Sequence, residues 1–548
     1  MARIKKLIIT GYRSIGDAVE INFPEGKPLI LIGENNSGKS NIVKAINLVL
    51  GQFHPAYHQP DDHEFFERDQ NKKIEIKVEF DPEDRYGDKY TEVVWRYNKN
   101  SPEPLQYRGR SGQLYGSSDG YIRSEHRDSC ICVLVEAERN LAYHLGYSSK
   151  WTMLSRLMHR FHRALSNEPQ IKNNLEKLFC EIKNNFYNVP QFGNFIIELQ
   201  NQMDNLIGSM TYRLNIDFEA YNPVNFFHAL RLQAKENNEP RTLEEMGTGE
   251  QQLLALCFAH AYAKAFHGGI VFVIEEPEAH LHPLAQKWLA KRLDEYCQDG
   301  LQILITTHSP SFININNLEG IVWVFKENGQ TKVKQININD LIDYCIKTGV
   351  PQNKISEVSV LPFYNSNSTT EILSGFFSKC VVLVEGPTES LALPVYLSKC
   401  GFDVLREGVA IIPVLGKGNL AKWVRLFSVY GIPCYTIFDN DSNDDRNKRK
   451  REDILKALNI QNPDEYLISE DILINNDFAV FGVNFETSLR NIFYDYQRLE
   501  QDAKENGIES KPFIAKWVAE KLDINDDKNN NGKEIIERLI DAIKSKII

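Results

Sequence analysis

Hydrophobic and polar residues alternate along the first part of the chain with the period of two that is typical of β-strands. A fully apolar run at residues 29–32 interrupts this alternation and has the character of a buried strand. Strands are expected at residues 3–10, 18–23, 29–32, 74–80, 92–97 and 131–135. Residues 99–120 are rich in Gly, Ser and Pro, which favours surface loops. The first part of the chain is therefore predicted to be a β-rich lobe.

From residue 151 to about residue 210 the period changes to that of a helix. Leu154, Leu157, Phe161 and Leu165 recur at helical spacing, with polar residues on the other faces. This pattern predicts a compact helical insert. The insert either packs as a subdomain or mediates contacts within a dimer, and the pattern alone leaves both interpretations open.

Short apolar runs separated by helical patterns dominate the rest of the chain, and they predict parallel sheets. Strands are expected at residues 269–274, 301–307, 320–325, 331–336, 381–384, 411–415 and 434–438. A polar stretch at residues 364–370 divides these runs into two groups and indicates a domain boundary. A helical C-terminal region is expected to follow the second group.

The apolar run at residues 29–32 leads directly into GENNSGKS, which matches the phosphate-binding pattern G-x-x-x-x-G-K-S between a strand and a helix. Glycines let backbone amides curl around an anion, and the helix N-terminus adds its positive end. Lys39 is expected to reach the β- and γ-phosphates, and Ser40 to supply a hydroxyl to Mg²⁺. The predicted contacts are Gly33, Asn35, Asn36, Ser37, Gly38, Lys39 and Ser40. The sequence therefore predicts binding of a nucleoside triphosphate.

Two later segments carry groups that suit the same nucleotide. Gly247, Thr248 and Gly249 stand before a long apolar helical pattern, where small residues expose backbone amides to an anion. Glu275 and Glu276 end a buried strand, so that one carboxylate can hold Mg²⁺ while its neighbour accepts a proton from water.

Three histidines lie close together in this part of the sequence. They are His280, His282 and His308, and they raise the alternative of a zinc site. We disfavour zinc because the adjacent carboxylates and the phosphate loop explain the cluster, and structural zinc usually brings cysteines.

A second group of carboxylates follows the later apolar strands. Glu385 and Glu389 come after the strand at 381–384, and Asp439 and Asp441 after the strand at 434–438. Because the carboxyl ends of parallel strands meet at one edge of a sheet, these four side chains are expected in one crevice. So many like charges require cations, and oxygen ligands favour Mg²⁺ or Mn²⁺. Two such ions form the usual clamp for phosphodiester chemistry.

Two basic features lie near this crevice. The triplet at residues 416–418, Gly-Lys-Gly, can place a backbone nest and an ammonium near a phosphate. The run at residues 446–451, which contains five basic side chains and one asparagine, is either a solvated face or a contact for a DNA backbone.

Composition narrows the class of protein without fixing its function. The chain of 548 residues is too long for one core, and no apolar run approaches the length of a membrane span, so we expect no membrane partner. Its nine cysteines form no C-x-x-C pair, which suits reduced thiols in a cytoplasmic protein. A net charge of −11 argues against a generally basic nucleic-acid surface but leaves room for a local basic groove.

The segments GENNSGKS, MGTGEQ, VFVIEEPEAHLHP and TTHSP, in that order, resemble the ATPase head of the SMC and ABC class. The resemblance implies Walker A roles for Lys39 and Ser40, a Walker B role for Glu275, and the catalytic glutamate role for Glu276. It also implies that His308 senses the γ-phosphate. Gly247, Thr248 and Gly249 match the signature motif, which contacts ATP on the opposite protomer, so a homodimer or higher homo-oligomer through the heads is expected.

Two parts of the SMC and ABC pattern are missing from the sequence. The glutamine of the Q-loop has no clear counterpart, and Asp61 and Asp62 are the nearest candidates. Coiled-coil arms are also absent, because residues 151–210 allow only a compact insert.

The pair EGPTE and DND resembles the Toprim domain of topoisomerases, primases and certain nucleases. An SMC-like head followed by Toprim resembles the OLD (overcoming lysogenization defect) family of ATP-dependent nucleases. Within this resemblance Glu486 is a further acidic metal ligand, and Lys511 is the late lysine that stabilises the transition state. The fold class implied is α/β: an ABC/SMC-like head at residues 1–370, with its helical insert at 151–210, and a Toprim (Rossmann-like) domain with a helical extension at 371–548.

The function implied is an ATP-regulated, divalent-metal-dependent DNA endonuclease that acts in bacterial defence against phage. Its expected cofactors are ATP and Mg²⁺, or Mn²⁺ at the Toprim site, and its expected partners are DNA and further copies of the chain. A helicase-like protein, or a reverse transcriptase with its retron DNA, is a further candidate partner. The alternatives are an SMC-like DNA clamp that does not cut and strand passage of the topoisomerase type, which needs a tyrosine nucleophile.

Overall fold

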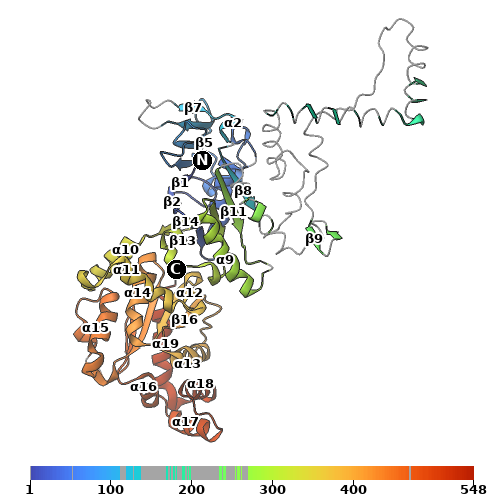
Figure 1. Ribbon diagram of the computed structural model, residues 1–548. Coiled ribbons are helices and arrows are strands. Elements are labelled where there is room, and N and C mark those ends of the chain that lie inside the picture. The colour runs from blue at the N-terminus through green and yellow to red at the C-terminus, as the bar shows by residue number, and fades with distance from the viewer. Residues whose placement is uncertain are drawn as a thin grey trace.

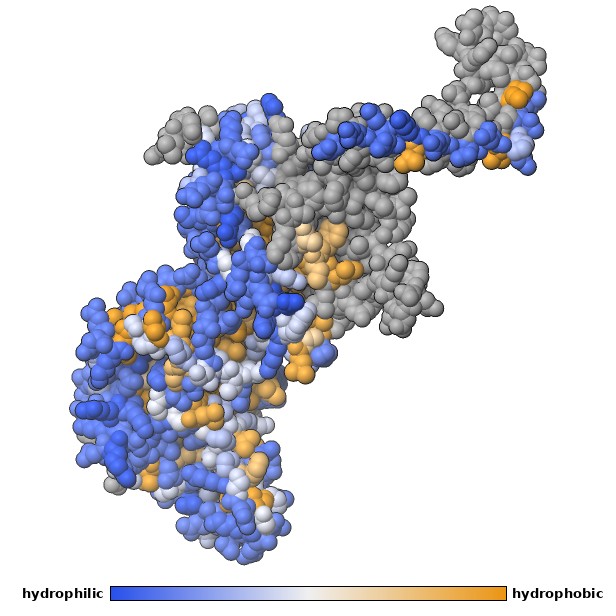
Figure 2. All heavy atoms as spheres, viewed as in Figure 1, coloured by the Kyte–Doolittle hydropathy of each residue, from blue (hydrophilic) through white to orange (hydrophobic). Residues whose placement is uncertain are grey.

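The computed structural model describes residues 2–51, 53–111, 119–127, 129–136, 269–279, 281–467 and 471–547, together with scattered residues between 168 and 261. These residues form an N-terminal unit with two six-stranded sheets and a C-terminal unit with one five-stranded sheet and most of the helices (Figure 1). The short strands β9 (Ala234–Glu236) and β10 (Glu239–Arg241) pair separately as an antiparallel two-stranded sheet. The face seen in Figure 2 is mostly hydrophilic, as expected for strands and helices that bury only one side.

The first sheet is antiparallel, with the strand order β2-β1-β4-β5-β6-β7. Its strands are β1 (Ile4–Thr10), β2 (Val19–Asn22), β4 (Ile74–Phe80), β5 (Glu92–Tyr97), β6 (Leu105–Arg110) and β7 (Asp119–Tyr121). In β4 the buried residues alternate with partly exposed ones along the strand, which is the pattern of a sheet with one face in the core. The alternation predicted from the sequence is thereby confirmed.

The second sheet contains the strands that carry the nucleotide motifs, in the order β14-β13-β3-β12-β11-β8. Its strands are β3 (Leu29–Ile32), β8 (Cys130–Val135), β11 (Gly269–Glu275), β12 (Gln302–Thr306), β13 (Ile321–Glu327) and β14 (Gln330–Gln335). All neighbouring pairs are parallel except β13 and β14. One face packs with α1 (Lys39–Leu50) and the first sheet, and the opposite face packs with α9 (Pro283–Gln298) and the C-terminal unit.

The C-terminal unit is built on a third sheet with the order β16-β15-β17-β19-β18, parallel except for β18. Its strands are β15 (Cys380–Val384), β16 (Val409–Pro413), β17 (Cys434–Asp439), β18 (Leu473–Ile474) and β19 (Phe478–Phe481). Helices cover the sheet: α13 (Pro387–Lys399), α14 (Lys417–Tyr430), α15 (Lys448–Ala457), α16 (Phe485–Ile492), α17 (Tyr496–Glu505), α18 (Lys511–Lys521) and α19 (Asn530–Lys544). The predicted helical C-terminal region is confirmed.

A continuous apolar core joins the two units. It includes Phe272 and Trp323 of the second sheet together with Trp423 and Phe427 of α14. The helices α10 (Ile338–Lys347), α11 (Glu357–Asn367) and α12 (Thr370–Ser374) lie at this junction. A tight junction of this kind lets a change in one unit reach the other.

The polar stretch at residues 364–370, which the sequence suggested as a domain boundary, is largely helical. α11 extends into it as far as Asn367, and the buried hydroxyl of Tyr364 donates a hydrogen bond to the carbonyl of Lys422 at 2.8 Å. Polar side chains on the outer face of α11 and α12 produced the appearance of a break, while the residues beneath them pack on α14.

The surface loops predicted at residues 99–120 are partly wrong, because β6 and β7 extend the first sheet there. Gly109 and Gly120 face Tyr90, and a Cβ on Gly109 would lie 2.4 Å from the Cγ atom of the Tyr90 ring. These glycines are therefore sites of close packing within a sheet rather than loop residues.

Several sequence predictions fall outside the described residues. They are a strand that the alternation of apolar and polar residues predicts at 212–218, the segment of Gly247, Thr248 and Gly249, and most of the helical insert at 151–210. Among the helices of the described residues, none is both long and apolar enough to cross a membrane.

Candidate functional site

The loop between β3 and α1 adopts a backbone that only particular residues permit. Gly33 and Gly38 have φ values of 139° and 112°, and Asn36 has φ 64°. A Cβ at Gly33 would lie 2.0 Å from the carbonyl oxygen of Val324, and one at Gly38 would lie 2.1 Å from Oγ1 of Thr331. Both the conformation and the space therefore require glycine at the two positions fixed by the phosphate-binding pattern.

Lys39 folds back onto this loop. Its Nζ atom donates hydrogen bonds to the carbonyls of Gly33 and Glu34 at 2.9 and 2.8 Å. Burial lowers the pKa of Lys39 to about 8, although the carboxylates of Glu276, Glu278 and Glu34 act in the opposite direction. An ammonium held by two carbonyls in a partly buried place gains much from an arriving phosphate, which fits the predicted role.

Glu275 and Glu276 stand at the end of β11, as predicted, but in different environments. Burial raises the pKa of Glu275, and its hydrogen bond to Ser40 opposes this rise. The structure thus brings together the two residues predicted to hold the Mg²⁺ of the nucleotide. Glu276 has a positive φ of 48°, and its amide donates to the carbonyl of Thr306 at 2.9 Å.

Glu278 is a residue of this site that sequence reasoning missed. Its two carboxylate oxygens accept hydrogen bonds from Oγ1 of Thr307 at 2.9 Å and from the amide of His308 at 2.6 Å. Glu278 thereby fixes the backbone that presents His308. The signal was available in the run Glu-Glu-Pro-Glu, whose third acid follows the strand end closely enough to face the same loop.

His308 lies near Lys39, as its predicted role requires. Burial and the charge of Lys39 lower the pKa of His308, so the neutral imidazole is favoured. His282 caps α9 instead: its Nδ1 accepts a hydrogen bond from the amide of Ala285 at 3.3 Å. Among the residues that the structure describes, which exclude His280, no group of three or more His, Cys, Asp or Glu side chains is arranged to hold a metal.

Asp61 and Asp62, the nearest candidates for the Q-loop role, belong to a short turn of their own. The amide of Asp61 donates to Oε2 of Glu64 at 3.2 Å, and Asp62 accepts from the side chain of Gln70. These contacts tie the turn to itself, so they do not support either residue in that role.

The second site lies where β15, β17 and β19 end. Glu385 follows β15 and Asp439 ends β17, and the amide of Asp439 donates to Oε1 of Glu385 at 2.8 Å. Glu389 lies on the first turn of α13, and Oε2 of its carboxylate accepts from the amide of Gly386 at 3.1 Å. The predicted meeting of strand ends is thus what the structure contains.

Glu486 and Lys511, which rested on single-residue resemblances, also reach this crevice. Glu486 lies on the first turn of α16 after β19, and its Oε1 is 2.9 Å from the Nζ atom of Lys511 at the start of α18. Burial lowers the pKa of Lys511, but the carboxylates of Glu486, Asp439 and Glu389 outweigh it and raise the pKa overall.

Four carboxylates at these strand ends lie close enough to affect one another's pKa values. Burial raises the pKa of Asp439 well above its ordinary value, and Glu385, Glu389 and Glu486 raise it further. Burial raises the pKa of Glu389 to about 7, with Glu385 and Glu486 contributing. Crowded carboxylates of this kind, with oxygen ligands only, fit Mg²⁺ or Mn²⁺. Among the described residues, however, these carboxylates are not already arranged as a group of three or more that could hold a metal ion.

Asp441 differs from the other four carboxylates because two nitrogen donors already form hydrogen bonds with it. Its Oδ2 accepts a hydrogen bond from Lys417 Nζ and another from Nδ2 of Asn447 at 3.1 Å. Lys417 also lies close to Glu385, with Nζ 3.3 Å from Oε1. The ammonium foreseen near a phosphate is therefore bound to two predicted metal ligands.

The basic run at residues 446–451 does not act as a single surface. Arg451 is fully buried, and its guanidinium donates to the carbonyls of Asn440 and Asp444 at 2.8 and 2.9 Å. For Arg451 the two predicted interpretations, a solvated face or a DNA contact, are therefore wrong, because the side chain braces the turn that carries Asp441. Ile454 and Leu455 follow it at helical spacing and mark the buried face of α15.

The chain matches two family models that correspond to these two sites. Residues 29–314 match the family described as "AAA domain, putative AbiEii toxin, Type IV TA system". This match covers more than half of the 548 residues. The chain belongs to this AAA family. Residues 376–441, which include β15 and β17, match the "Overcoming lysogenization defect protein-like, TOPRIM domain". The AAA domain thus carries the nucleotide loop and the OLD-like Toprim domain carries the carboxylate crevice, as the resemblance implied.

Individual relatives share this combination. The chain is 26% identical to an OLD nuclease of Thermus scotoductus over 474 residues, which cover 83% of this chain and 86% of that protein. It is 27% identical over 222 residues to the Old nuclease of Escherichia phage P2, covering 39% of this chain and 36% of the relative. It is 25% identical over 241 residues to the endonuclease GajA of Bacillus cereus, covering 39% of this chain and 34% of the relative. The resemblance to the OLD family stated from sequence is confirmed.

Proposed function

We propose that this chain is an ATP-regulated, divalent-metal-dependent DNA endonuclease that acts in defence against phage. The observation that carries the proposal is the crevice in which Glu385, Glu389, Asp439 and Glu486 surround one volume beside Lys511. The nuclease names of its relatives support cutting over an SMC-like clamp. A clamp has no need for a buried cluster of carboxylates whose mutual repulsion destabilises the fold.

We expect the residues of the crevice to have different roles in phosphodiester hydrolysis. Glu385, Glu389, Asp439, Asp441 and Glu486 would hold Mg²⁺ or Mn²⁺. When bound, such ions lower the pKa of water and offset the charge on a phosphoryl group. The amide of Asp439 fixes Glu385, and Lys511 places a positive charge at the mouth of the crevice, where it can stabilise charge that develops on the phosphate.

The nucleotide site is proposed to be the regulatory half of the molecule. Lys39 and Ser40 would bind the phosphates and Mg²⁺ of ATP together with Glu275, and Glu276 would activate water. Glu278 positions His308 to sense the γ-phosphate. The second half of the site would come from Gly247, Thr248 and Gly249 of another copy, which makes a homodimer, or a higher homo-oligomer, the active form.

A defence role supplies candidate partners beyond DNA. A helicase-like protein, or a reverse transcriptase with its retron DNA, would deliver or present the substrate. One of the relatives named above is the Old nuclease of Escherichia phage P2. Action of this chain against phage is therefore part of the proposal and does not follow from the fold.

Incubation of the full chain with supercoiled plasmid tests the proposal. With Mg²⁺ or Mn²⁺ we expect nicked or linear products, and with EDTA we expect none, because removal of the ions removes the clamp on the phosphate. Binding of the plasmid without cutting under every metal and nucleotide condition would instead favour the clamp. A protein–DNA adduct that survives denaturation would favour strand passage through a tyrosine.

A further inference from the structure

We propose that Lys417 balances the charge of the crevice before a metal binds, and that the metal displaces it from Glu385 and Asp441. This inference rests on the proposed nuclease function and adds a positioning residue to it. Lys417 is the first residue of α14, and its side chain is only 6% exposed. Its Nζ atom contacts Glu385, which follows β15, and Asp441, which follows β17.

The Lys417 ammonium and a divalent cation compete for the same carboxylate oxygen atoms of Glu385 and Asp441. A buried lysine is costly unless carboxylates pair with it, and buried carboxylates are costly unless cations pair with them. Through its contacts with Glu385 and Asp441, Lys417 meets both needs at once. Binding of a metal to Glu385 and Asp441 therefore has to break these contacts, and the measured metal affinity includes that cost.

The surroundings allow the lysine to move while the carboxylates stay. Arg451 is held by two backbone carbonyls and lies 3.8 Å from Oδ2 of Asp441, so it braces the turn from the other side. Lys417 has a flexible four-carbon stem, and its Nζ atom contacts the carboxylates of Glu385 and Asp441. Once displaced, its ammonium remains beside the crevice, where a DNA phosphate can take the place of the carboxylates.

Titration of Mn²⁺ into the nucleotide-free full chain tests this role by calorimetry. Lys417→Met keeps the aliphatic stem and removes the competing charge, so we expect Mn²⁺ to bind at least about tenfold more tightly. Lys417→Arg keeps the charge and should show no gain. The Met variant should also cut DNA more slowly at saturating metal, while its melting temperature and ATP hydrolysis report that it is folded.

The outcomes separate this inference from the function on which it rests. Unchanged or weaker Mn²⁺ binding by Lys417→Met, with clear loss of binding in Asp439→Asn, overturns the role of Lys417 alone. Equal binding by wild type and Asp439→Asn would mean that the crevice is not the metal site, and both proposals would fall.

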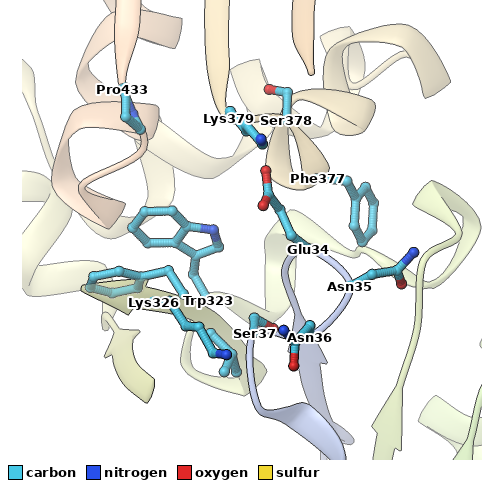
Figure 3. Close-up of a pocket in the computed structure, with 12 residues that line it drawn as sticks. Glu34, Asn35, Asn36, Ser37, Trp323, Lys326, Phe377, Ser378, Lys379 and Pro433 are labelled. Atoms are coloured by element: carbon cyan, nitrogen blue, oxygen red, sulfur yellow. The ribbon is translucent and has the colours of Figure 1, made fainter. Parts of the chain in front are cut away.

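A second inference concerns how ATP bound at the nucleotide loop could affect the carboxylates of the crevice. A cavity of about 240 Å³ lies between the nucleotide loop and the C-terminal unit (Figure 3). Its lining residues are Glu34, Asn35, Asn36 and Ser37 of the loop, residues 323–326 of β13, and Phe377, Ser378, Lys379 and Pro433. The side chain of Glu34 points toward Lys379 across this cavity (Figure 3).

The cavity residues from the C-terminal unit directly precede the two strands that carry carboxylates of the crevice. Phe377, Ser378 and Lys379, which we call the coupling segment, immediately precede β15, and Pro433 immediately precedes β17. β15 leads to Glu385 and β17 ends at Asp439, and the two strands are hydrogen-bonded neighbours. Because buried strands move as rigid units, a shift at their start is transmitted to their end.

Two groups that are predicted to contact the nucleotide, Lys39 and His308, lie beside this region. Lys39 holds the carbonyl of Glu34 at 2.8 Å and has to release it to bind phosphate. The ring of His308 lies 6.3 Å from the ring of Phe377, centroid to centroid. We infer that the coupling segment transmits the nucleotide state to the crevice, and this too rests on the proposed function.

Cutting assays on Phe377→Ala and Lys379→Met test this coupling. Both variants should cut DNA without ATP, and hydrolyse ATP, at close to wild-type rates. The ratio of cutting rates with and without ATP should fall from its wild-type value to about one, because the coupling free energy between the sites is lost. Lys521→Met, on α18 at the far side of the C-terminal unit, is the matched control and should keep the wild-type ratio (Figure 1).

A wild-type ratio in both variants overturns the role of the coupling segment. A wild type whose cutting does not respond to ATP at all would contradict the regulatory half of the proposed function, and this inference with it.

Discussion

Asp439→Asn is expected to abolish DNA cutting and leave ATP hydrolysis intact. Asp439 is the most crowded carboxylate of the crevice, since Glu385, Glu389 and Glu486 all raise its pKa in addition to burial. Removing its charge removes a central ligand for the ions, which supply several kcal/mol of transition-state stabilisation, so the cutting rate should fall by about a thousandfold or more. Glu385→Ala should behave in the same way, because Glu385 accepts the amide hydrogen bond of Asp439.

The same variant should be more stable than the wild type in metal-free buffer. An aspartate whose pKa is raised in the folded state costs stability when it is ionised; this cost accumulates as pH rises from the ordinary pKa to the raised pKa and is complete above it. Asp439→Asn removes the charge, so its melting temperature should exceed that of the wild type at alkaline pH. Loss of cutting in a variant that melts higher cannot be attributed to unfolding.

Asp477→Asn provides the matched control for this prediction. Asp477 lies just before β19, at the end of the sheet opposite the crevice, and pairs with Lys546. It should cut plasmid at the wild-type rate. Cutting by Asp439→Asn at a rate similar to that of this control would place the chemistry elsewhere in the chain.

Lys39→Ala is expected to abolish ATP hydrolysis together with any effect of ATP on cutting. The Lys39 ammonium donates to the carbonyls of Gly33 and Glu34, and we expect the phosphates of ATP to replace these carbonyls as its partners. Its loss should lower ATP turnover by about a hundredfold or more, since it removes a charge-assisted contact worth several kcal/mol in the transition state. Cutting with metal alone should continue, because Lys39 belongs to the other unit.

Glu276→Gln separates ATP binding from hydrolysis in the same assay. It should bind ATP and hold the cutting rate at the value that ATP sets, because only the proton acceptor is lost. The exposed Lys27→Ala serves as a control for the Lys39 variant and should hydrolyse ATP normally. ATP hydrolysis at the wild-type rate by Lys39→Ala would mean that the nucleotide loop is not the site of ATP hydrolysis.

Local patterns explain why much of this architecture could be predicted from the sequence. The strand before Gly33, the strand before Glu385 and the strand before Asp439 are short apolar runs that end in polar residues. In a parallel sheet these ends must meet, so both sites followed from strand order and motif spacing.

The errors concern charges whose partners are distant in the sequence. Arg451 appeared to belong to a basic surface, yet its partners are carbonyls of a turn that only the fold places beneath it. Lys417 was foreseen near a phosphate, and its pairing with Glu385 and Asp441 depends on two separate strands. Glu278 was missed because its partners, Thr307 and His308, lie on a neighbouring strand end. Burial of a charged residue depends on such long-range packing, which periodicity does not report.

The central claim is that the crevice cuts DNA while the nucleotide loop controls it. Plasmid cutting and phosphate release, recorded in the same reactions with and without ATP, test it in wild type, Asp439→Asn and Lys39→Ala. We expect Asp439→Asn to hydrolyse ATP without cutting DNA, and Lys39→Ala to cut DNA without hydrolysing ATP or responding to it. Cutting by Asp439→Asn at the wild-type rate, or a wild-type response of Lys39→Ala to ATP, would contradict this claim.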